Sequence, residues 1–199
     1  MMRRLAWVAL VISLASWFAP ALGQPARRAV PHIAASGSVQ AAFSPWDDVE
    51  GIIVTALAAA RRQVLVQAYS FTSRPIANAL IAARRRGIDV RITADREQTF
   101  AGENSRIPEL AAAGIPVLLE LRYASAHNKV MVIDAGLADS VVITGSYNWT
   151  WSAQHRNAEN LLIVRRNAEL TGAYTANWHR HAADAISFES IREDALAPQ

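Results

Sequence analysis

The chain has 199 residues, of which 52% are hydrophobic and 19% charged, and a formal net charge of +3. This length suits one compact domain, and the apolar content is too high for a disordered chain. No cysteine is present, which excludes a disulfide framework, a thiol nucleophile and any zinc site built on thiolates. Arginine supplies every basic residue except Lys129, the only lysine.

The first 23 residues have the pattern of a signal peptide. Two arginines precede an uncharged apolar run at 5–18, and small residues follow at 21–23. The run is shorter than the ~20 apolar residues of a membrane span, so an uncleaved N-terminal anchor is the less favoured alternative. We therefore expect a periplasmic or secreted protein without a stable membrane anchor, with a mature chain that begins near Gln24 and a flexible segment over 24–38.

Strands and helices alternate through residues 39–185, which we expect to form a single domain followed by a C-terminal tail over 186–199. Apolar patterns predict strands at 39–43, 64–71, 88–94, 115–119, 130–133, 141–144 and 161–164. Capping signals predict helices that begin at Ser44, Ser73, Ser105 and Asn167. A helix, a glycine and an apolar strand recur twice, which is typical of crossovers onto parallel strands. The expected class is α/β, with a mixed, largely parallel sheet and helices on both faces.

A histidine and the only lysine stand together at the start of one predicted strand. Residues 127–134 read His-Asn-Lys-Val-Met-Val-Ile-Asp. Alternation along a strand places His127 and Lys129 on one face, ~6.5–7 Å apart, so an imidazole and an ammonium can converge on one tetrahedral anion. A planar guanidinium does not easily replace a compact ammonium at a crowded phosphate, which explains a lysine in an arginine-rich chain.

Further polar residues lie at the ends of the next two predicted strands. Ser146 and Asn148 follow the strand at 141–144, and Glu159 opens the strand after it. Open α/β sheets bind ligands at such strand ends. We therefore expect these three side chains to lie beside His127 and Lys129. No cluster of carboxylates with the spacing of a metal site is visible.

This combination resembles the signature of the phospholipase D superfamily. H-x-K-x₄-D lies at 127–134, G-S-x-N at 145–148 and Glu-Asn at 159–160. The chain is most similar to the superfamily's small, secreted bacterial endonucleases with a single motif, over most of residues 39–182. The resemblance implies an enzyme without a cofactor: a metal-independent phosphodiesterase that hydrolyses DNA with low sequence specificity, RNA being left open as a second substrate.

The resemblance also implies a role for each residue of the motifs. His127 is expected to attack phosphorus and form a phosphohistidine, which an imidazole with the ordinary pKa of ~6.5 permits at neutral pH. Lys129 and Asn148 are expected to hold the phosphate oxygens, and Ser146 to bind phosphate or orient a neighbour. Glu159 is the candidate that accepts the other imidazole N–H and fixes the tautomer.

Two expectations concern the completeness of the site. Asp134 belongs to the catalytic signature, but seven residues of strand place it over ~20 Å from His127, which favours an anchoring role, for example to an arginine, over a direct one. The chemistry needs two H-x-K units, because one histidine attacks and the other protonates the leaving oxygen. One lysine gives half a site, so we expect a homodimer in which the His127 residues of both subunits meet at the interface.

Two other functions are kept as alternatives. The first is hydrolysis or transfer on phospholipid head groups by the same chemistry, and the second is non-catalytic binding of nucleic acid on a retained scaffold. His179 and His181 resemble a metal pair, but residues two apart on a helix do not face each other, so no metal site is predicted. Tyr69 is interpreted as packing, whereas Trp149 and Trp151 fit core packing and base stacking equally well.

Overall fold

A computed structural model of the chain describes residues 30–101 and 104–191, and its compact body begins at Ile33. The signal peptide predicted over 1–23 lies outside the described residues. Of the segment predicted to be flexible over 24–38, residues 30–38 are described; 30–37 contain neither helix nor strand, whereas Ser38 begins the first strand. Within the described part of the chain, no helix combines the length and apolar character that crossing a membrane requires.

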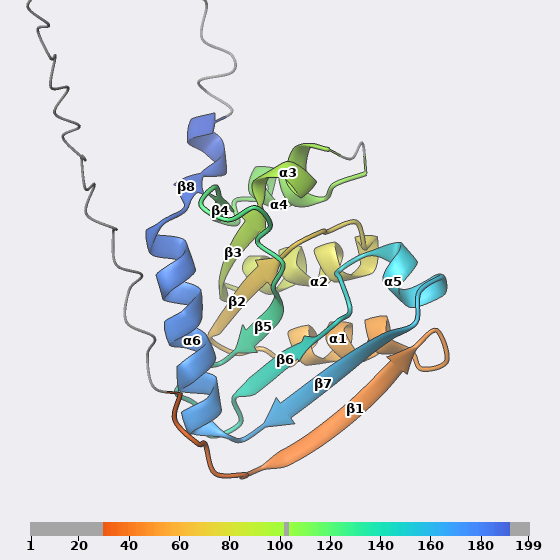
Figure 1. Cartoon of the computed structure of the whole chain (residues 1–199), viewed down its shortest axis with the longest axis vertical. Coiled ribbons are helices and arrows are strands. Elements are labelled where there is room, and N and C mark those ends of the chain that lie inside the picture. Colours follow the sequence, from red (N-terminus) through yellow and green to blue (C-terminus); the bar gives the residue numbers. More distant parts are fainter. Residues whose placement is uncertain (1–29, 102–103, 192–199) are drawn as a thin grey trace, which may run out of the picture. The chain divides into compact units, whose positions relative to one another are not determined.

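Eight strands form one mixed sheet in the order β1-β7-β6-β5-β2-β3-β4-β8 (Figure 1). The strands are β1 (Ser38–Ser44), β2 (Gln63–Ala68), β3 (Asp89–Asp95), β4 (Val117–Glu120), β5 (Lys129–Ile133), β6 (Val141–Gly145), β7 (Glu159–Arg165) and β8 (Ile186–Ser187). This confirms the α/β class and the mixed sheet. Only the pairs β2–β3 and β3–β4 are parallel. The pairing is therefore less parallel than predicted. The last helical crossover leads into β4, and the later strands β5, β6 and β7 pair antiparallel with their neighbours.

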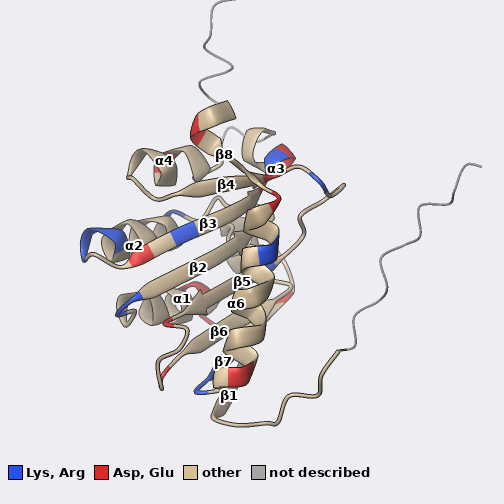
Figure 2. Ribbon diagram, turned by 90° about the vertical axis from the view of Figure 1, so that its left-hand side faces the viewer, with Lys and Arg blue, Asp and Glu red and all other residues tan. Residues whose placement is uncertain are grey.

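Helices cover both faces of the sheet, as predicted. They are α1 (Val49–Ala58), α2 (Arg74–Arg85), α3 (Arg96–Phe100), α4 (Ile107–Ala112), α5 (Trp151–His155) and α6 (Ala168–Ala183). Figure 2 shows α6 in front of the sheet, with α1, α2 and α4 on its other side. The larger core lies on the α1–α2 side and includes Ile53, Leu80 and Ile92. On the other face, Trp178 of α6 packs on a smaller cluster with Leu65 and Val130.

Most helix starts follow local capping chemistry, although α4 begins at Ile107 after Arg106, two residues beyond the predicted Ser105, without a side-chain cap. The Ser73 hydroxyl accepts a hydrogen bond from the amide of Ile76 and caps α2, as predicted. The helix start predicted at Ser44 is wrong. Ser44 is the last residue of β1, and its hydroxyl donates to the carbonyl oxygen of Ala153 at 2.6 Å. Asp48 caps α1 instead, because its carboxylate is free to accept from the helix's first turn.

The sheet continues beyond residue 185, where the sequence predicts a tail. Strand β8 pairs antiparallel with β4, and residues 188–191 are helical. Phe188 is buried and stacks against Phe100 of α3 with ring centroids 6.0 Å apart. The apolar side chains of this short segment therefore close the β4 edge, and only residues 192–199 of the predicted tail lie outside the described chain.

Candidate active site

The ends of several strands meet at one edge of the sheet. The register pairs Ala68 with Lys129, Gly145 with Leu161 and Ser44 with Glu159. Strands β5 and β7 therefore begin where β2, β6 and β1 end. Lys129 and Glu159 also share the alternation of Met131 and Leu161, whose side chains lie in the larger core. The lysine and the glutamate consequently belong to the same face of the sheet.

The turn after β6 is held tightly against β7. The backbone amides of Ser146 and Tyr147 both donate to the carbonyl oxygen of Asn160, at 3.1 and 3.3 Å. A Cβ atom at Gly145 would lie 2.2 Å from the same oxygen, so only glycine allows this approach. The Ser146 hydroxyl accepts from the backbone amide of Asn160 at 3.0 Å. Within one chain, Ser146 therefore orients its neighbour across the strand pair.

Lys129 lies buried between its neighbours, with 5% of its surface exposed. Its Nζ donates to the carbonyl oxygen of His127 at 2.8 Å and lies 4.7 Å from the centroid of the Tyr69 ring. Burial lowers the pKa of the Lys129 ammonium to about 8, although the negative charge of Glu159 acts in the opposite direction. The ammonium is thus charged at neutral pH, desolvated and close to the histidine.

His127 lies in the loop that precedes β5 and is exposed. Its ring packs on Tyr69, with centroids 4.3 Å apart, and its side chain forms no hydrogen bond among the described residues. The expected contact with Glu159 is not made within the chain. The Glu159 carboxylate instead accepts from the side-chain amide of Asn157 at 2.9 Å, so both groups keep capacity for contacts outside the chain.

Tyr69 is a member of the site that the sequence analysis misses. It follows β2 and touches the two central residues, since its ring meets the imidazole of His127 and the ammonium of Lys129. The backbone amide of Tyr69 donates to the carbonyl oxygen of Asn128 at 3.1 Å, which extends the β2–β5 ladder to the loop. The sequence shows an aromatic residue at the end of a predicted strand. It does not show that β5 pairs antiparallel with this strand and so places Tyr69 against His127.

Asn148 stands between two residues that are completely buried, Tyr147 and Trp149. The Trp149 indole donates to the carbonyl oxygen of Gln67 at 3.0 Å. Trp149 is therefore a core residue and does not stack on a base. The Oδ1 atom of Asn148 is buried and has no hydrogen-bond donor in the described chain. Buried polar atoms without a partner are rare and occur at functional positions. The turn therefore fixes the backbone of Asn148 firmly while part of its amide stays unpaired.

Asp134 lies at the opposite end of β5. It is 3% exposed, and its carboxylate accepts from the backbone amides of Arg61, Arg62 and Gln63 at 2.9, 2.7 and 3.0 Å. This is the anchoring arrangement that its position in the strand predicts. The anchor is the backbone of the segment that leads into β2 rather than an arginine side chain, because amides converge on both carboxylate oxygens.

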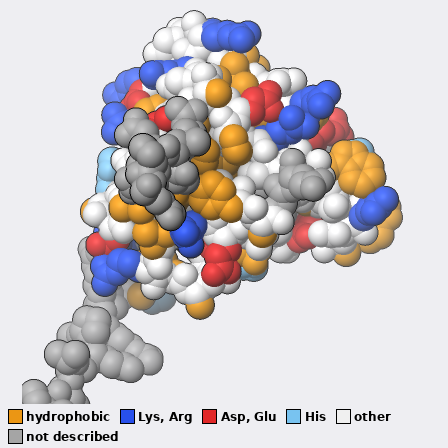
Figure 3. All heavy atoms as spheres, turned by 90° about the horizontal axis from the view of Figure 1, so that it is seen from above, with side chains coloured by type: hydrophobic (Ala, Val, Ile, Leu, Met, Phe, Trp, Pro, Cys, Tyr) orange, Lys and Arg blue, Asp and Glu red, His pale blue; other side chains and the backbone are white. Residues whose placement is uncertain are grey.

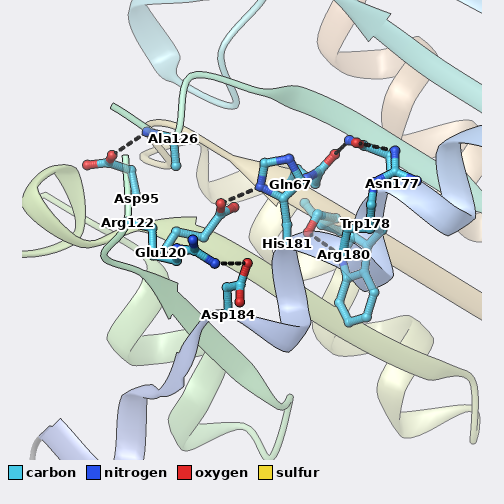
Figure 4. Close-up of polar contacts among 11 residues, drawn as sticks. Gln67, Asp95, Glu120, Arg122, Ala126, Asn177, Trp178, Arg180, His181 and Asp184 are labelled. Atoms are coloured by element: carbon cyan, nitrogen blue, oxygen red, sulfur yellow. Dashed lines mark hydrogen bonds and ion pairs between the residues drawn. The ribbon is translucent and has the colours of Figure 1, made fainter. Parts of the chain in front are cut away.

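The loop that carries His127 is tied to the rest of the domain by buried polar contacts (Figure 4). Nδ1 of His181 lies 2.5 Å from the carboxylate of Glu120, whose side chain is 3% exposed. Further along, the Asp95 carboxylate accepts from the backbone amide of Ala126 at 2.8 Å, one residue before His127. The ring of His179 meets Trp178 edge-on instead, so the two histidines face different partners. In the described residues, no three His, Asp or Glu side chains are grouped to hold a metal ion.

Comparisons with known proteins agree with this geometry. A family model described as "Cardiolipin synthase, PLD-like domain" matches residues 53–182. A protein named phospholipase D from Rickettsia typhi is 36% identical over 152 residues, which cover 76% of this chain and 72% of the relative. A crystal structure of a phospholipase D family member, Nuc from Salmonella typhimurium, has a TM-score of 0.71 and 29% identity over 77% of this chain and 99% of its own. NucT from Helicobacter pylori has a TM-score of 0.69 and 26% identity over 77% of this chain and 100% of its own.

Proposed function

The chain belongs to the phospholipase D superfamily and is one of its phosphodiesterases, and we propose that it is an endonuclease that cleaves DNA without a metal ion. The observation that carries the proposal is the edge of the sheet where an exposed imidazole and a desolvated ammonium both contact Tyr69, next to the turn that carries Asn148. His127, Lys129 and Asn148 are the groups that in-line attack on a phosphodiester needs. RNA, whose backbone has the same phosphodiester group, is a second substrate of this proposal.

In the proposed mechanism, a nitrogen of the neutral His127 ring attacks phosphorus, and the bond from phosphorus to the leaving oxygen breaks. A second histidine donates a proton to that oxygen. Water then attacks the phosphohistidine, gives its proton to the second histidine and releases His127. Lys129 and Asn148 stabilise the charge on the non-bridging oxygens throughout, and a buried ammonium does this more strongly than an exposed one.

The surface around the fold supports nucleic acid over lipid. Viewed from above, basic, acidic and apolar side chains are intermixed (Figure 3). Among the large exposed apolar residues, Phe100 lies on α3, whereas Phe43 of β1 and Leu162 of β7 lie on paired strands and on the same sheet face. A few neighbouring apolar residues are normal on protein surfaces, whereas engagement of a bilayer favours a larger apolar patch with basic residues around it. Phospholipid head groups are therefore the second candidate, since the superfamily chemistry itself would serve both substrates.

The second histidine in this mechanism comes from another copy of the chain. The sequence contains one H-x-K unit. His127 is exposed, and Glu159 makes no hydrogen bond to it within the chain, which fits a site completed by the same residues of a two-fold partner. Analytical ultracentrifugation should show a dimer at working concentration. A fully active monomer would contradict the dimer and the requirement for a second His127.

The proposed reaction is tested with plasmid DNA in excess EDTA. We expect the wild type to degrade the plasmid and His127→Ala to lose at least ~10⁴-fold in rate, as for other nucleophiles in covalent catalysis. A ³²P-labelled substrate should leave acid-labile label on wild-type protein only. Metal-dependent cleavage, or equal activity of the variant, would refute the proposal. Head-group release from vesicles without cleavage of DNA would favour the lipid reaction, and retarded but intact plasmid would favour a binding protein.

We also propose that residues 1–23 direct export, so that the mature enzyme is periplasmic or secreted. The arginine pair, the short apolar run and the small residues before Gln24 support this. N-terminal sequencing of the protein recovered from a bacterial periplasm or culture medium should give a start near Gln24. Recovery of an intact N-terminus in the membrane fraction would instead indicate an uncleaved anchor.

A further inference from the structure

Trp151 is an exposed aromatic residue very close to the candidate site. It opens α5 three residues after Asn148, so the two Cα atoms are at most ~11 Å apart. Half of its surface (50%) is exposed, whereas Trp149, two residues earlier, is completely buried. The backbone amide of Trp151 donates to the hydroxyl of Thr72 at 3.3 Å, which fixes the start of α5 beside the segment that follows β2. The backbone of Trp151 is therefore held in place while half of the residue is exposed.

Positive charge surrounds this indole. The guanidinium carbon of Arg156 lies 5.0 Å from the centroid of the Trp151 ring, and the His155 ring lies 4.7 Å from it. A groove of about 510 Å³ adjoins the indole, and Arg74 and Arg106 are among its lining residues. Arg106 pairs with Glu109, but in the described chain Arg74 and Arg156 have no carboxylate within ion-pair distance. Two exposed cations next to the ring are thus available to phosphates.

A second exposed tryptophan lacks this setting. Trp46 is 82% exposed and lines a different cavity. Its neighbours Asp47 and Asp48 line the same cavity, and their carboxylates repel phosphate. Both tryptophans are exposed but their charge environments are opposite, which makes Trp46 a control for Trp151.

We propose that Trp151, Arg156 and Arg74 form a subsite that binds an unpaired nucleotide next to the phosphate being cleaved, with its base stacked on the indole. The inference rests on the proposed nuclease function and specifies the substrate as single-stranded nucleic acid. Stacking on an aromatic ring needs a base with a free face, and in a duplex both faces of an internal base are covered by its neighbours. Thr72, Ser73 and Ser152 line the same groove, and such polar walls suit a nucleotide better than acyl chains.

The test measures binding in the His127→Ala background, in which the substrate stays intact. Fluorescence anisotropy compares the affinity for a 12-nucleotide oligo-dT with that for a 12-base-pair duplex. Trp151→Ala and Trp151→Leu should weaken oligo-dT binding by about 5- to 150-fold, the range of one lost base–aromatic stack. Trp151→Phe, which keeps an aromatic face, should lose less than about threefold. Duplex binding should change by less than twofold in each variant, as should oligo-dT binding by Trp46→Ala.

Salt dependence tests the cations of the same subsite. Arg156→Gln should reduce the slope of log affinity for oligo-dT against log salt by about 0.7, the value for one phosphate contact on a single strand. An unchanged slope would remove Arg156 from the subsite and overturn the assignment as stated.

Several results would overturn the inference while the proposed function stands. The first is a wild type that degrades DNA in EDTA while Trp151→Leu binds oligo-dT normally. The second is an equal loss of oligo-dT affinity in Trp46→Ala and Trp151→Ala. The third is an equal loss of affinity for oligo-dT and for the duplex. Dissociation of the dimer in Trp151→Ala, measured by ultracentrifugation, would make the indole an interface residue instead. Loss of binding to phosphatidylglycerol vesicles with oligo-dT binding unchanged would make it a membrane contact. A wild type that neither cleaves nor binds DNA would remove the proposed function, and the inference with it.

Discussion

Strand β5 carries the residues of the H-x-K-x₄-D motif at or next to its two ends, and the surroundings of the two ends are opposite. At the first end, His127 is exposed and its side chain forms no hydrogen bond among the described residues, while Lys129 is buried with a lowered pKa. At the other end, the Asp134 carboxylate is 3% exposed and receives three backbone amides. One short motif thus combines groups left unsatisfied for a substrate with a group satisfied entirely by the protein.

This contrast indicates how the motif divides its work. The amides that bind Asp134 belong to the segment entering β2, and β2 pairs with β5 along its length up to Ala68 opposite Lys129. Asp134 therefore fixes the register of the strand pair whose other end carries the chemistry. A substitution at the Lys129 end should therefore lower activity without lowering stability, and a substitution of Asp134 should lower stability more than activity.

The largest effect is expected at the chemical end. Lys129→Met should lower kcat by about 10²–10³-fold, because a preorganised donor to the phosphate oxygens is lost. Its free energy of unfolding should stay the same or rise, since an apolar side chain replaces a buried ammonium. Lys129→Arg should lose activity as well, because a planar guanidinium does not easily replace a compact ammonium at a crowded phosphate. Initial rates on plasmid and urea unfolding curves measure both quantities. Full activity of Lys129→Met would exclude Lys129 from catalysis.

At the structural end, Asp134→Ala should lower the free energy of unfolding by at least about 3 kcal/mol. It leaves backbone amides of the β2 entry without their acceptor, and hydrogen bonds to a charged group each contribute about 1.5–3 kcal/mol. Below its unfolding temperature, the variant should keep most of its kcat. Asp139→Ala is the control, because Asp139 pairs with Arg61 at the surface with 55% of its side chain exposed, and exposed pairs contribute only ~0–1 kcal/mol. Equal stability of the two variants would contradict the anchoring role.

The difference between the two ends also explains what the sequence reveals. His127, Lys129 and Glu159 could be placed at one sheet edge because alternation and strand ends are local properties. The distance of Asp134 from His127 along the strand likewise favoured anchoring. Its acceptor role toward three backbone amides could not be predicted, because those amides lie over 70 residues earlier and carry no side-chain signal.

The features that the sequence analysis misses depend on contacts between residues that are far apart in the chain. The two helix–strand repeats predicted β3 and β4 correctly, but the antiparallel return of β5 depends on which edge of the sheet accepts it. Tyr69 joined the site through that pairing. Strand β8 has only two residues, too few for a period to emerge, and its pairing with β4 is decided by tertiary packing. The sequence alone does not distinguish Trp149 from Trp151, because the turn after Asn148 decides that Trp149 is buried and Trp151 exposed.

The smallest expected effect is a shift of the pH profile, and it sharpens the role of Lys129. Its pKa of about 8 means that the charged form is complete well below pH 8 and is lost as the pH rises through 8. If the ammonium stabilises the reacting phosphate, log kcat should fall with a slope approaching –1 above pH 8. The Glu159 charge raises that pKa, so Glu159→Gln should move the alkaline limb to lower pH. In Lys129→Arg the residual activity should show no such limb, because a guanidinium keeps its proton over this range. An alkaline limb that persists in Lys129→Arg would assign the titration to another group.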